Sequence, residues 1–160
     1  MASKESIYKA LEEVMDPEIP VLSVIDLGMI TDVQTGDEIV VKMIPTFAAC
    51  PAISYLQSNI KKVLEEKLKM PVSVLIDKSV NWASSRMTQA GREKLKNYGI
   101  APPPREQQSD PLLTIASQVP CPHCGSRETY LRSPFGATLC RAMHYCKSCG
   151  QVFEQFKPLD

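Results

Sequence analysis

The stretch CPHCGSRETYLRSPFGATLCRAMHYCKSCG, residues 121–150, decides the fold of the C-terminal part of the chain. It begins and ends with matched Cys-x-x-Cys-Gly segments. This spacing allows two thiolates to bind one ion while the glycine turns the chain, and two such segments complete a closed tetrahedral site. We therefore predict a β zinc ribbon that holds a structural ion, with disulfides or a redox dithiol as the alternatives. The predicted ligands are Cys121, Cys124, Cys146 and Cys149.

The residues between the two cysteine pairs predict a small β unit around this ion. We expect residues 127–132 and 137–145 to form a hairpin. A unit of this size cannot be stabilised by burial alone, so the metal is expected to supply much of its folding free energy. The aromatic residues expected to pack as its core are Tyr130, Phe135, Phe153 and Phe156.

Three further side chains lie near the cysteine pairs. Cys140 is a fifth thiol, which could be a spare ligand, a redox thiol or a packed strand residue; packing is favoured because free cysteine is often buried. His123 and His144 could each replace a cysteine, but a set of four cysteines is geometrically simpler. We expect both histidines to lie beside the site or at the surface.

Composition and charge bound the classes of function. The 160 residues carry a formal net charge of zero, so no global attraction to nucleic acid is expected. The N-terminus has no secretory apolar core, and no stretch approaches membrane-spanning length. We therefore expect a cytoplasmic protein without membrane contact, in which reduced, paired cysteines bind metal rather than form disulfides.

Residues 101–111, APPPREQQSDP, predict a boundary between two domains. Three consecutive prolines exclude a helix and favour an extended spacer. The predicted organisation is an N-terminal domain at 1–100, a linker at 101–111 and the zinc ribbon at 112–160.

Apolar periodicity and turn residues predict six elements in the N-terminal domain. The order α-β-β-α-β-α is typical of an α+β domain in which helices pack on a short sheet. The predicted elements are a helix ending before Asp16, strands at 29–35 and 38–44, a helix at 51–68, a strand at 72–76, and a helix N-capped by Thr88 that ends near Tyr98 and Gly99.

Cys50 stands alone, immediately before a proline that favours the first position of a helix. At a helix N-terminus, the unpaired N–H groups and the helix dipole favour a thiolate, which is the form that binds metal. Thr46 offers a hydroxyl in the same turn. The alternative is that Cys50 is a small buried hydrophobic residue.

The segment DPEIPVLSVIDLG, residues 16–28, predicts a long loop that carries Asp16, Glu18 and Asp26. Taken singly, each acid could end a helix or be a solvated charge. Long loops of this kind are often functional. If this loop lies over the start of the second helix, one carboxylate and Cys50 could share a labile iron or zinc ion with open coordination positions.

These residues carry a resemblance. The segment DPEIPVLSVIDLG, followed by Thr46-x-x-x-Cys50-Pro51, resembles the SufT-like family of metal–sulfur cluster assembly proteins. NYGIAPP at 97–103 and the ribbon further resemble the PaaD-like (PaaJ-like) family of bacterial phenylacetate degradation, over nearly the whole chain. The signature positions that the resemblance implies are Asp16, Pro17, Glu18, Asp26, Gly28, Thr46, Cys50 and Pro51, with Cys121, Cys124, Cys140, Cys146 and Cys149 in the ribbon.

The resemblance implies an accessory protein of the multicomponent phenylacetyl-CoA epoxidase, and not its catalytic subunit. The implied partners are the di-iron oxygenase and the flavin- and [2Fe–2S]-containing reductase, or the iron–sulfur assembly machinery. The implied role is to mature or repair a metal centre, with iron or an iron–sulfur cluster held transiently at Cys50. Two departures stand out: Phe47-Ala48-Ala49 replaces Tyr-Ser-Gly, and Trp82-Ala83-Ser84-Ser85-Arg86 replaces Trp-Thr-Thr-Asp-Trp.

Other classes of function stay open at this point. The chain could be a general iron–sulfur assembly factor, or an adaptor in which Cys50 is inert. A nucleic-acid-binding ribbon is disfavoured because the basic residues of the ribbon are scattered. A cysteine hydrolase is the weakest alternative, because both histidines lie in the ribbon, away from Cys50. An exposed sheet edge could support a homodimer.

Overall fold

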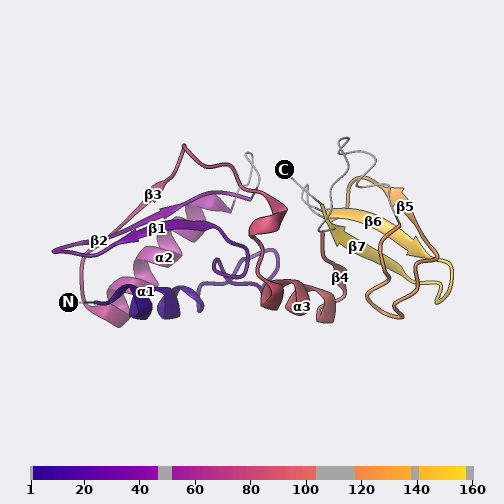
Figure 1. Ribbon diagram of the computed structural model, residues 1–160, viewed down its shortest axis with the longest axis horizontal. Helices are drawn as coiled ribbons and strands as arrows, with labels where there is room; N and C mark the ends of the chain where they lie inside the picture. Colours follow the sequence, from indigo (N-terminus) through magenta and orange to yellow (C-terminus); the bar gives the residue numbers. More distant parts are fainter. Residues whose placement is uncertain (1, 47–51, 104–117, 138–140, 158–160) are drawn as a thin grey trace. The chain divides into compact units, whose positions relative to one another are not determined.

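The computed structural model describes residues 2–46, 52–103, 118–137 and 141–157. Their contacts divide the chain into two compact units (Figure 1). The N-terminal unit comprises Met1–Trp82 and Arg86–Gly91, and the ribbon unit comprises Ala83–Ser85 and Arg92–Asp160. Each unit has its own sheet. No helix of the described residues is long and apolar enough to span a membrane.

The N-terminal unit contains a three-stranded sheet in the order β1-β2-β3, with β1 antiparallel and β3 parallel to β2. A parallel pair needs a crossover connection, and α2 supplies it between β2 and β3. The elements are α1 (Lys4–Leu11), β1 (Ile30–Gln34), β2 (Ile39–Met43), α2 (Ile53–Leu68) and β3 (Val72–Ile76). The α+β fold class predicted from the sequence is confirmed.

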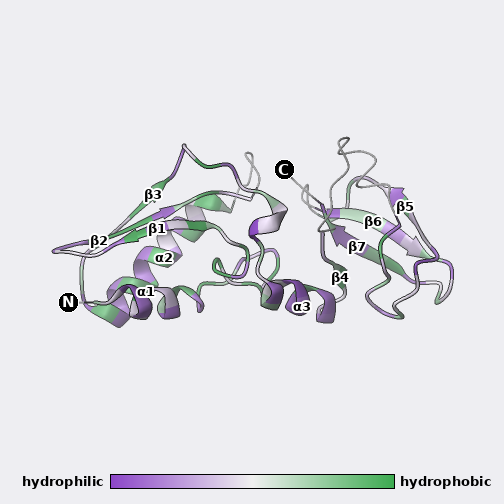
Figure 2. Cartoon of the chain, viewed as in Figure 1, coloured by the Kyte–Doolittle hydropathy of each residue, from purple (hydrophilic) through white to green (hydrophobic). Residues whose placement is uncertain are grey.

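The core of this unit lies between the sheet and the two helices. One face of α2 buries Leu56, Ile60 and Leu64, and the strand β2 directs alternate residues into the same core. Figure 2 shows hydrophobic and hydrophilic residues interleaved along α2, as expected for a helix with one buried face. The helix α1 ends at Leu11, earlier than predicted, yet Val14 is still fully buried.

The helix α3 (Gln89–Asn97) follows a short 3-10 turn, η1 (Ser84–Arg86). The predicted caps are present: the Thr88 hydroxyl accepts a hydrogen bond from the Gly91 N–H at 3.0 Å. Gly99 has a φ of 96°, a left-handed conformation that glycine adopts readily after a helix.

The ribbon unit contains a four-stranded sheet in the order β4-β7-β6-β5. The pairs β5–β6 and β6–β7 are antiparallel, as a hairpin fold requires, whereas β4 is parallel to β7. The strands are β4 (Ile100–Ala101), β5 (Thr129–Ser133), β6 (Arg141–Cys146) and β7 (Val152–Phe156). The strand β4 was not predicted, because two residues carry no periodicity. Most of the predicted linker, 104–111, lies outside the described residues, and the predicted domain boundaries stay predictions.

The predicted aromatic core of the ribbon is only half correct. Phe153 and Phe156 are buried, but Tyr130 is 43% exposed and Phe135 is 61% exposed. Tyr130 faces away from the core because its neighbour in β5, Thr129, occupies the buried face, and strand side chains alternate. Phe135 lies in the connection from β5 to β6. The core cluster consists instead of Ala101, Val119, Cys121, Cys146 and Phe153.

Candidate metal centre

The structure brings the four ribbon cysteines together. Their sulfur atoms all lie within 4.8 Å of one another. The Sγ atoms of Cys121 and Cys149 are 3.8 Å apart, and those of Cys124 and Cys146 are 3.6 Å apart. Tetrahedral zinc with Zn–S bonds of about 2.3 Å places its sulfur atoms about 3.8 Å from one another. The two sulfur pairs therefore match tetrahedral spacing, and all four thiols converge closely enough to hold one ion.

The two cysteine pairs are held by matched turns. In each, the glycine N–H donates to the carbonyl of the first cysteine, at 2.8 Å for Gly125 and 2.9 Å for Gly150. Their φ angles are 75° and 73°, in the left-handed region that a residue with a Cβ rarely adopts. The His123 N–H donates to the Cys121 sulfur at 3.4 Å. The glycine bonds close the two turns, and the His123 N–H points at the Cys121 sulfur.

The thiol pKa values show why a cation suits this cluster. The backbone N–H of Cys149 stabilises the Cys146 thiolate and, against the effect of burial, lowers its pKa to about 7. For Cys149, the N–H of Gln151 favours ionisation, but burial and the neighbouring thiols outweigh it and raise the pKa to about 12. The neighbouring thiols therefore favour the protonated form of Cys149, because its proton is held in hydrogen bonds between sulfur atoms. A divalent cation would instead favour the ionised form of all four thiols.

Neither histidine joins the four sulfur atoms. His144 is fully buried, and its Nε2 lies 2.7 Å from the Gln155 Oε1, with its ring stacked on Phe153. Burial lowers the pKa of His144, although the contact with Gln155 opposes this. Within the described part of the chain, the four cysteines are the one group of three or more converging potential metal ligands. Cys140 lies outside the described residues.

The acidic loop uses its carboxylates to organise its own backbone. The Asp16 Oδ1 accepts hydrogen bonds from the N–H groups of Glu18, at 2.8 Å, and Ile19, at 3.0 Å. The Asp26 Oδ2 accepts from the Ser23 N–H, and the Ser23 hydroxyl accepts from the Asp26 N–H, both at 3.0 Å. Both aspartates are buried. The motif thus encodes two tight turns.

Cys50 falls within residues 47–51, outside the described residues. Thr46 is described and is 9% exposed. The loop acids Asp16, Glu18 and Asp26 do not form a three-ligand cluster with any other described residue. The predicted labile metal site therefore stays a prediction.

A second segment holds the acidic loop in place, and sequence reasoning missed it. The Trp82 Nε1–H donates to the Leu27 carbonyl at 2.6 Å, and the Thr88 N–H donates to the Asp26 carbonyl at 2.9 Å. The signal that could have found it is the combination of a lone tryptophan and an arginine just before a helix cap.

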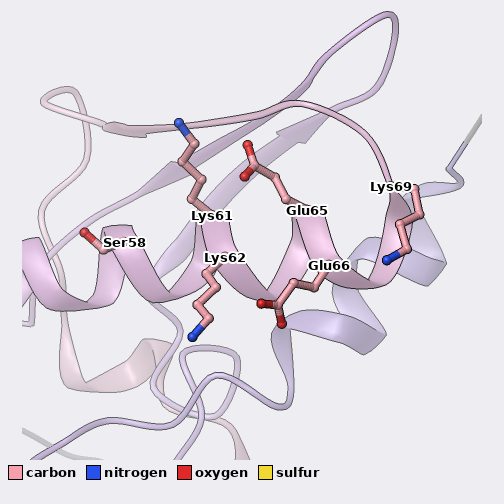
Figure 3. A pocket seen from close by; sticks show the side chains of 6 residues that line it. All are labelled: Ser58, Lys61, Lys62, Glu65, Glu66 and Lys69. Atoms are coloured by element: carbon pink, nitrogen blue, oxygen red, sulfur yellow. The ribbon is translucent and has the colours of Figure 1, made fainter.

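The surface of α2 carries an open hollow of about 450 Å³ in which lysines and glutamates alternate along the helix. Figure 3 shows Lys61 and Glu65 on one side of the helix and Lys62 and Glu66 on the other. Opposite charges four residues apart stabilise a helix without concentrating charge on a ligand. The lining residues are Ser58, Lys61, Lys62, Glu65, Glu66 and Lys69. This hollow is a solvated helix face rather than a site.

Two family models match separate parts of the chain. Residues 4–76 match the iron-sulfur cluster assembly protein model, and residues 105–157 match the PaaD zinc beta ribbon domain. An Escherichia coli (strain K12) protein, named as a subunit of a "Putative 1,2-phenylacetyl-CoA epoxidase", is 38% identical over 152 residues, which cover 94% of this chain and 90% of that protein.

Two other relatives cover the N-terminal part. An uncharacterized protein of Methanocaldococcus jannaschii is 34% identical over 89 residues, which are 51% of this chain and 93% of that protein. The crystal structure of a domain of unknown function, DUF59, from Bacillus anthracis matches with a TM-score of 0.54 and 27% identity, covering 57% of this chain and 90% of that chain.

The fold and the cysteine cluster define a class of protein: an iron–sulfur cluster assembly domain joined in one chain to a zinc ribbon. The Escherichia coli relative aligns across both parts and not across one alone. The chain belongs to the PaaD family.

Proposed function

We propose that this protein is a non-catalytic accessory factor of a phenylacetyl-CoA epoxidase, and that it helps to assemble or repair an iron or iron–sulfur centre of that enzyme. The observation that carries the proposal is the 38% identity to the Escherichia coli relative over 94% of the chain. The match of residues 4–76 to an iron–sulfur assembly model supports the type of role.

The two kinds of site have different proposed tasks. The ion in the ribbon is zinc bound by Cys121, Cys124, Cys146 and Cys149, and it is structural because four protein ligands leave no open position. Iron, or an iron–sulfur unit, is cargo that Cys50 holds transiently. The candidates to assist Cys50 are Asp16, Glu18, Asp26 and Thr46, because carboxylate, hydroxyl and thiolate donors together suit an exchangeable ion.

The test of the iron-handling role is Cys50→Ser, coexpressed with the epoxidase subunits. We expect the iron content and the activity of the purified epoxidase to fall, because serine is a poor ligand for iron at neutral pH. The matched control is Ser58→Ala, which removes an exposed hydroxyl of α2 that belongs to neither proposed ligand set. Wild-type iron and activity with Cys50→Ser would show that the Cys50 role is wrong.

Elemental analysis without oxygen separates the two metals. We expect about one zinc per chain in both the wild type and Cys50→Ser, because one closed site holds one ion. Iron should be present in the wild type alone. Zinc that disappears together with iron in Cys50→Ser would contradict the separation of the two sites.

The second candidate function is an adaptor that docks a partner through the ribbon. It is favoured by Tyr98, Tyr130, Phe135 and Val152, which are 40–61% exposed, and by a hollow of about 590 Å³ bordered by Tyr98, Met143 and Val152. Copurification with epoxidase subunits that survives Cys50→Ser but is lost on deletion of 112–160 would favour this function.

The proposed partners are the oxygenase and reductase subunits of the epoxidase, or the iron–sulfur assembly machinery, in the cytoplasm. A homodimer through an open edge of the three-stranded sheet is a further proposal, since β1 and β3 each have one partner strand among the described residues. Size-exclusion chromatography with light scattering tests it.

A further inference from the structure

The acidic loop is bracketed by a segment that lies outside the matched assembly model. That model ends at residue 76, whereas Trp82 and Arg86–Gly91 belong to the N-terminal unit by their contacts. This segment supplies donors to successive carbonyl groups of the loop and of the start of β1. The loop therefore depends on residues that the family match does not include.

Within this segment, Arg86 donates to two backbone carbonyls, one in the loop and one in β1. Its Nε donates to the Gly28 carbonyl at 2.8 Å, and its Nη2 donates to the Ile30 carbonyl at 3.3 Å. The side chain is half-buried. Among the described residues, no acidic side chain forms an ion pair with it. Its guanidinium is thus committed to backbone carbonyls, which is an orienting role rather than a charge-pairing one.

Two glycines show how closely the bracket fits. Gly28 has a φ of 66°, and a Cβ there would overlap the carbonyl oxygen of Arg86. A Cβ at Gly91 would lie 2.9 Å from the Asp26 carbonyl oxygen. With the 2.6 Å bond from Trp82 to Leu27, the backbone of residues 26–28 is contacted at every residue. Such a loop has little freedom to rearrange.

We propose that Arg86 is a positioning residue for the Asp26 loop, and that Trp82 and residues 86–91 belong to the functional part of the assembly domain. The inference rests on the proposed function for the role of the loop, but not for the contacts themselves. Arg86 acts through Gly28 and Ile30, and it does not touch the cargo. Its loss should loosen the loop that presents Asp26, and thereby reduce delivery of iron to the epoxidase.

The experiment uses the full chain with Arg86→Met, which keeps the length of the side chain but removes its donors, and Arg86→Lys, which keeps the charge but cannot span two carbonyls. Lys61→Met on the exposed face of α2 is the matched control. Hydrogen exchange is followed at the amides of residues 27–29, which are hydrogen-bonded within the loop, and in β2 as an internal reference. Epoxidase iron is measured in parallel.

We expect Arg86→Met to speed exchange at residues 27–29 about tenfold, the effect of losing roughly one charged hydrogen bond, with β2 unchanged. Epoxidase iron should fall, and Arg86→Lys should recover part of both signals. If Arg86→Met fails to fold, Trp82→Phe, which removes the Nε1–H donor to Leu27 together with part of the buried ring, carries the same test.

Two results would overturn the inference. Unchanged exchange at residues 27–29 would show that Arg86 does not hold the loop. Faster exchange with wild-type epoxidase iron would show a purely structural role. The Cys50→Ser arm distinguishes the causes: iron lost with Cys50→Ser but kept with Arg86→Met rejects the positioning role alone, whereas iron kept in both rejects the proposed function and the positioning role with it.

Discussion

The two units of this chain are stabilised in opposite ways. The N-terminal unit has a continuous apolar core in which side chains such as Leu11, Met43, Leu56 and Ile60 are fully shielded from solvent. Among the described residues, the core cluster of the ribbon unit has five members, and two of them are proposed metal ligands. Below a certain size a domain cannot bury enough apolar surface, so a metal must supply the missing free energy. One unit should therefore survive conditions that unfold the other.

The units also differ in which groups stabilise their negatively charged side chains. In the acidic loop, backbone N–H groups of the same turn satisfy the carboxylates of Asp16 and Asp26. In the ribbon, the N–H of Gln151 favours the Cys149 thiolate, but burial and the neighbouring thiols outweigh it and raise the pKa of Cys149 to about 12. Charge is balanced locally in one unit, and in the other it requires an ion.

Metal removal should separate the two units most clearly. A strong chelator applied to the full chain should abolish amide protection in β5, β6 and β7 while β2 stays protected. Structural zinc in small domains contributes on the order of 10 kcal/mol, far more than this small core can replace. Hydrogen exchange with mass spectrometry measures both units at once. Equal loss of protection in both would contradict independent stabilisation.

A cavity in the apolar core should lower the stability of the N-terminal unit and leave the ribbon unit unchanged. Leu11→Ala removes a side chain that is fully buried, and such changes cost about 3 kcal/mol. The free energy of unfolding of the N-terminal unit, measured in urea, should fall by this amount while the zinc content stays constant. Leu75→Ala is the control, because Leu75 is 50% exposed and should cost well under half as much. A similar loss from both would mean that β3 is covered in solution.

Gly28→Ala should destabilise the N-terminal unit by about 2–3 kcal/mol, because a left-handed φ is combined with a backbone overlap at Arg86. Gly36→Ala is the matched control: no atom lies within 4 Å of a Cβ there, so the change should be small. Thermal and urea unfolding measure both variants. If the two substitutions lower the free energy of unfolding equally, the contact between Gly28 and the Arg86 backbone is less close than the structure shows.

Gly125→Ala in the ribbon should have the smallest effect. The φ of 75° opposes a side chain, but the space around a Cβ is empty, so only the conformational cost of about 1 kcal/mol applies. Competition with a chromogenic chelator should show a modest loss of zinc affinity. A loss of zinc affinity as large as that from Cys124→Ser would mean that the absence of a side chain at Gly125 matters for more than its φ angle.

Local patterns explain what could be predicted from the sequence. The strand at 72–76 was predicted residue for residue, because Val, Leu and Ile follow a helix that ends at a clear turn. The convergence of the ribbon cysteines followed from their spacing. The Thr88 cap followed from its place before an amphipathic run.

Contacts between segments distant in the sequence could not be predicted. The strand β4 exists only because β7 offers it a partner, and Tyr130 could be assigned to the wrong face because one residue of register reverses every side chain. The sequence alone does not distinguish Asp16 and Asp26 as metal ligands from Asp16 and Asp26 as turn residues, since a short carboxylate serves both uses. The structure adds their hydrogen bonds to the backbone of the turns.

The pairing of β4 with β7 limits how this chain could have been assembled from modules. The matched domains end at residue 76 and resume at residue 105, which suggests a free junction. Yet Trp82, Arg86 and Thr88 donate to the acidic loop, and residues 100–101 pair with β7 in the ribbon sheet. A fragment that ends at 76 would remove the donors to Leu27 and Gly28, and one that begins at 105 would leave an edge of β7 unpaired. An excised N-terminal domain must therefore extend to residue 91, and an excised ribbon must begin before Ile100, for each to keep its own hydrogen bonds.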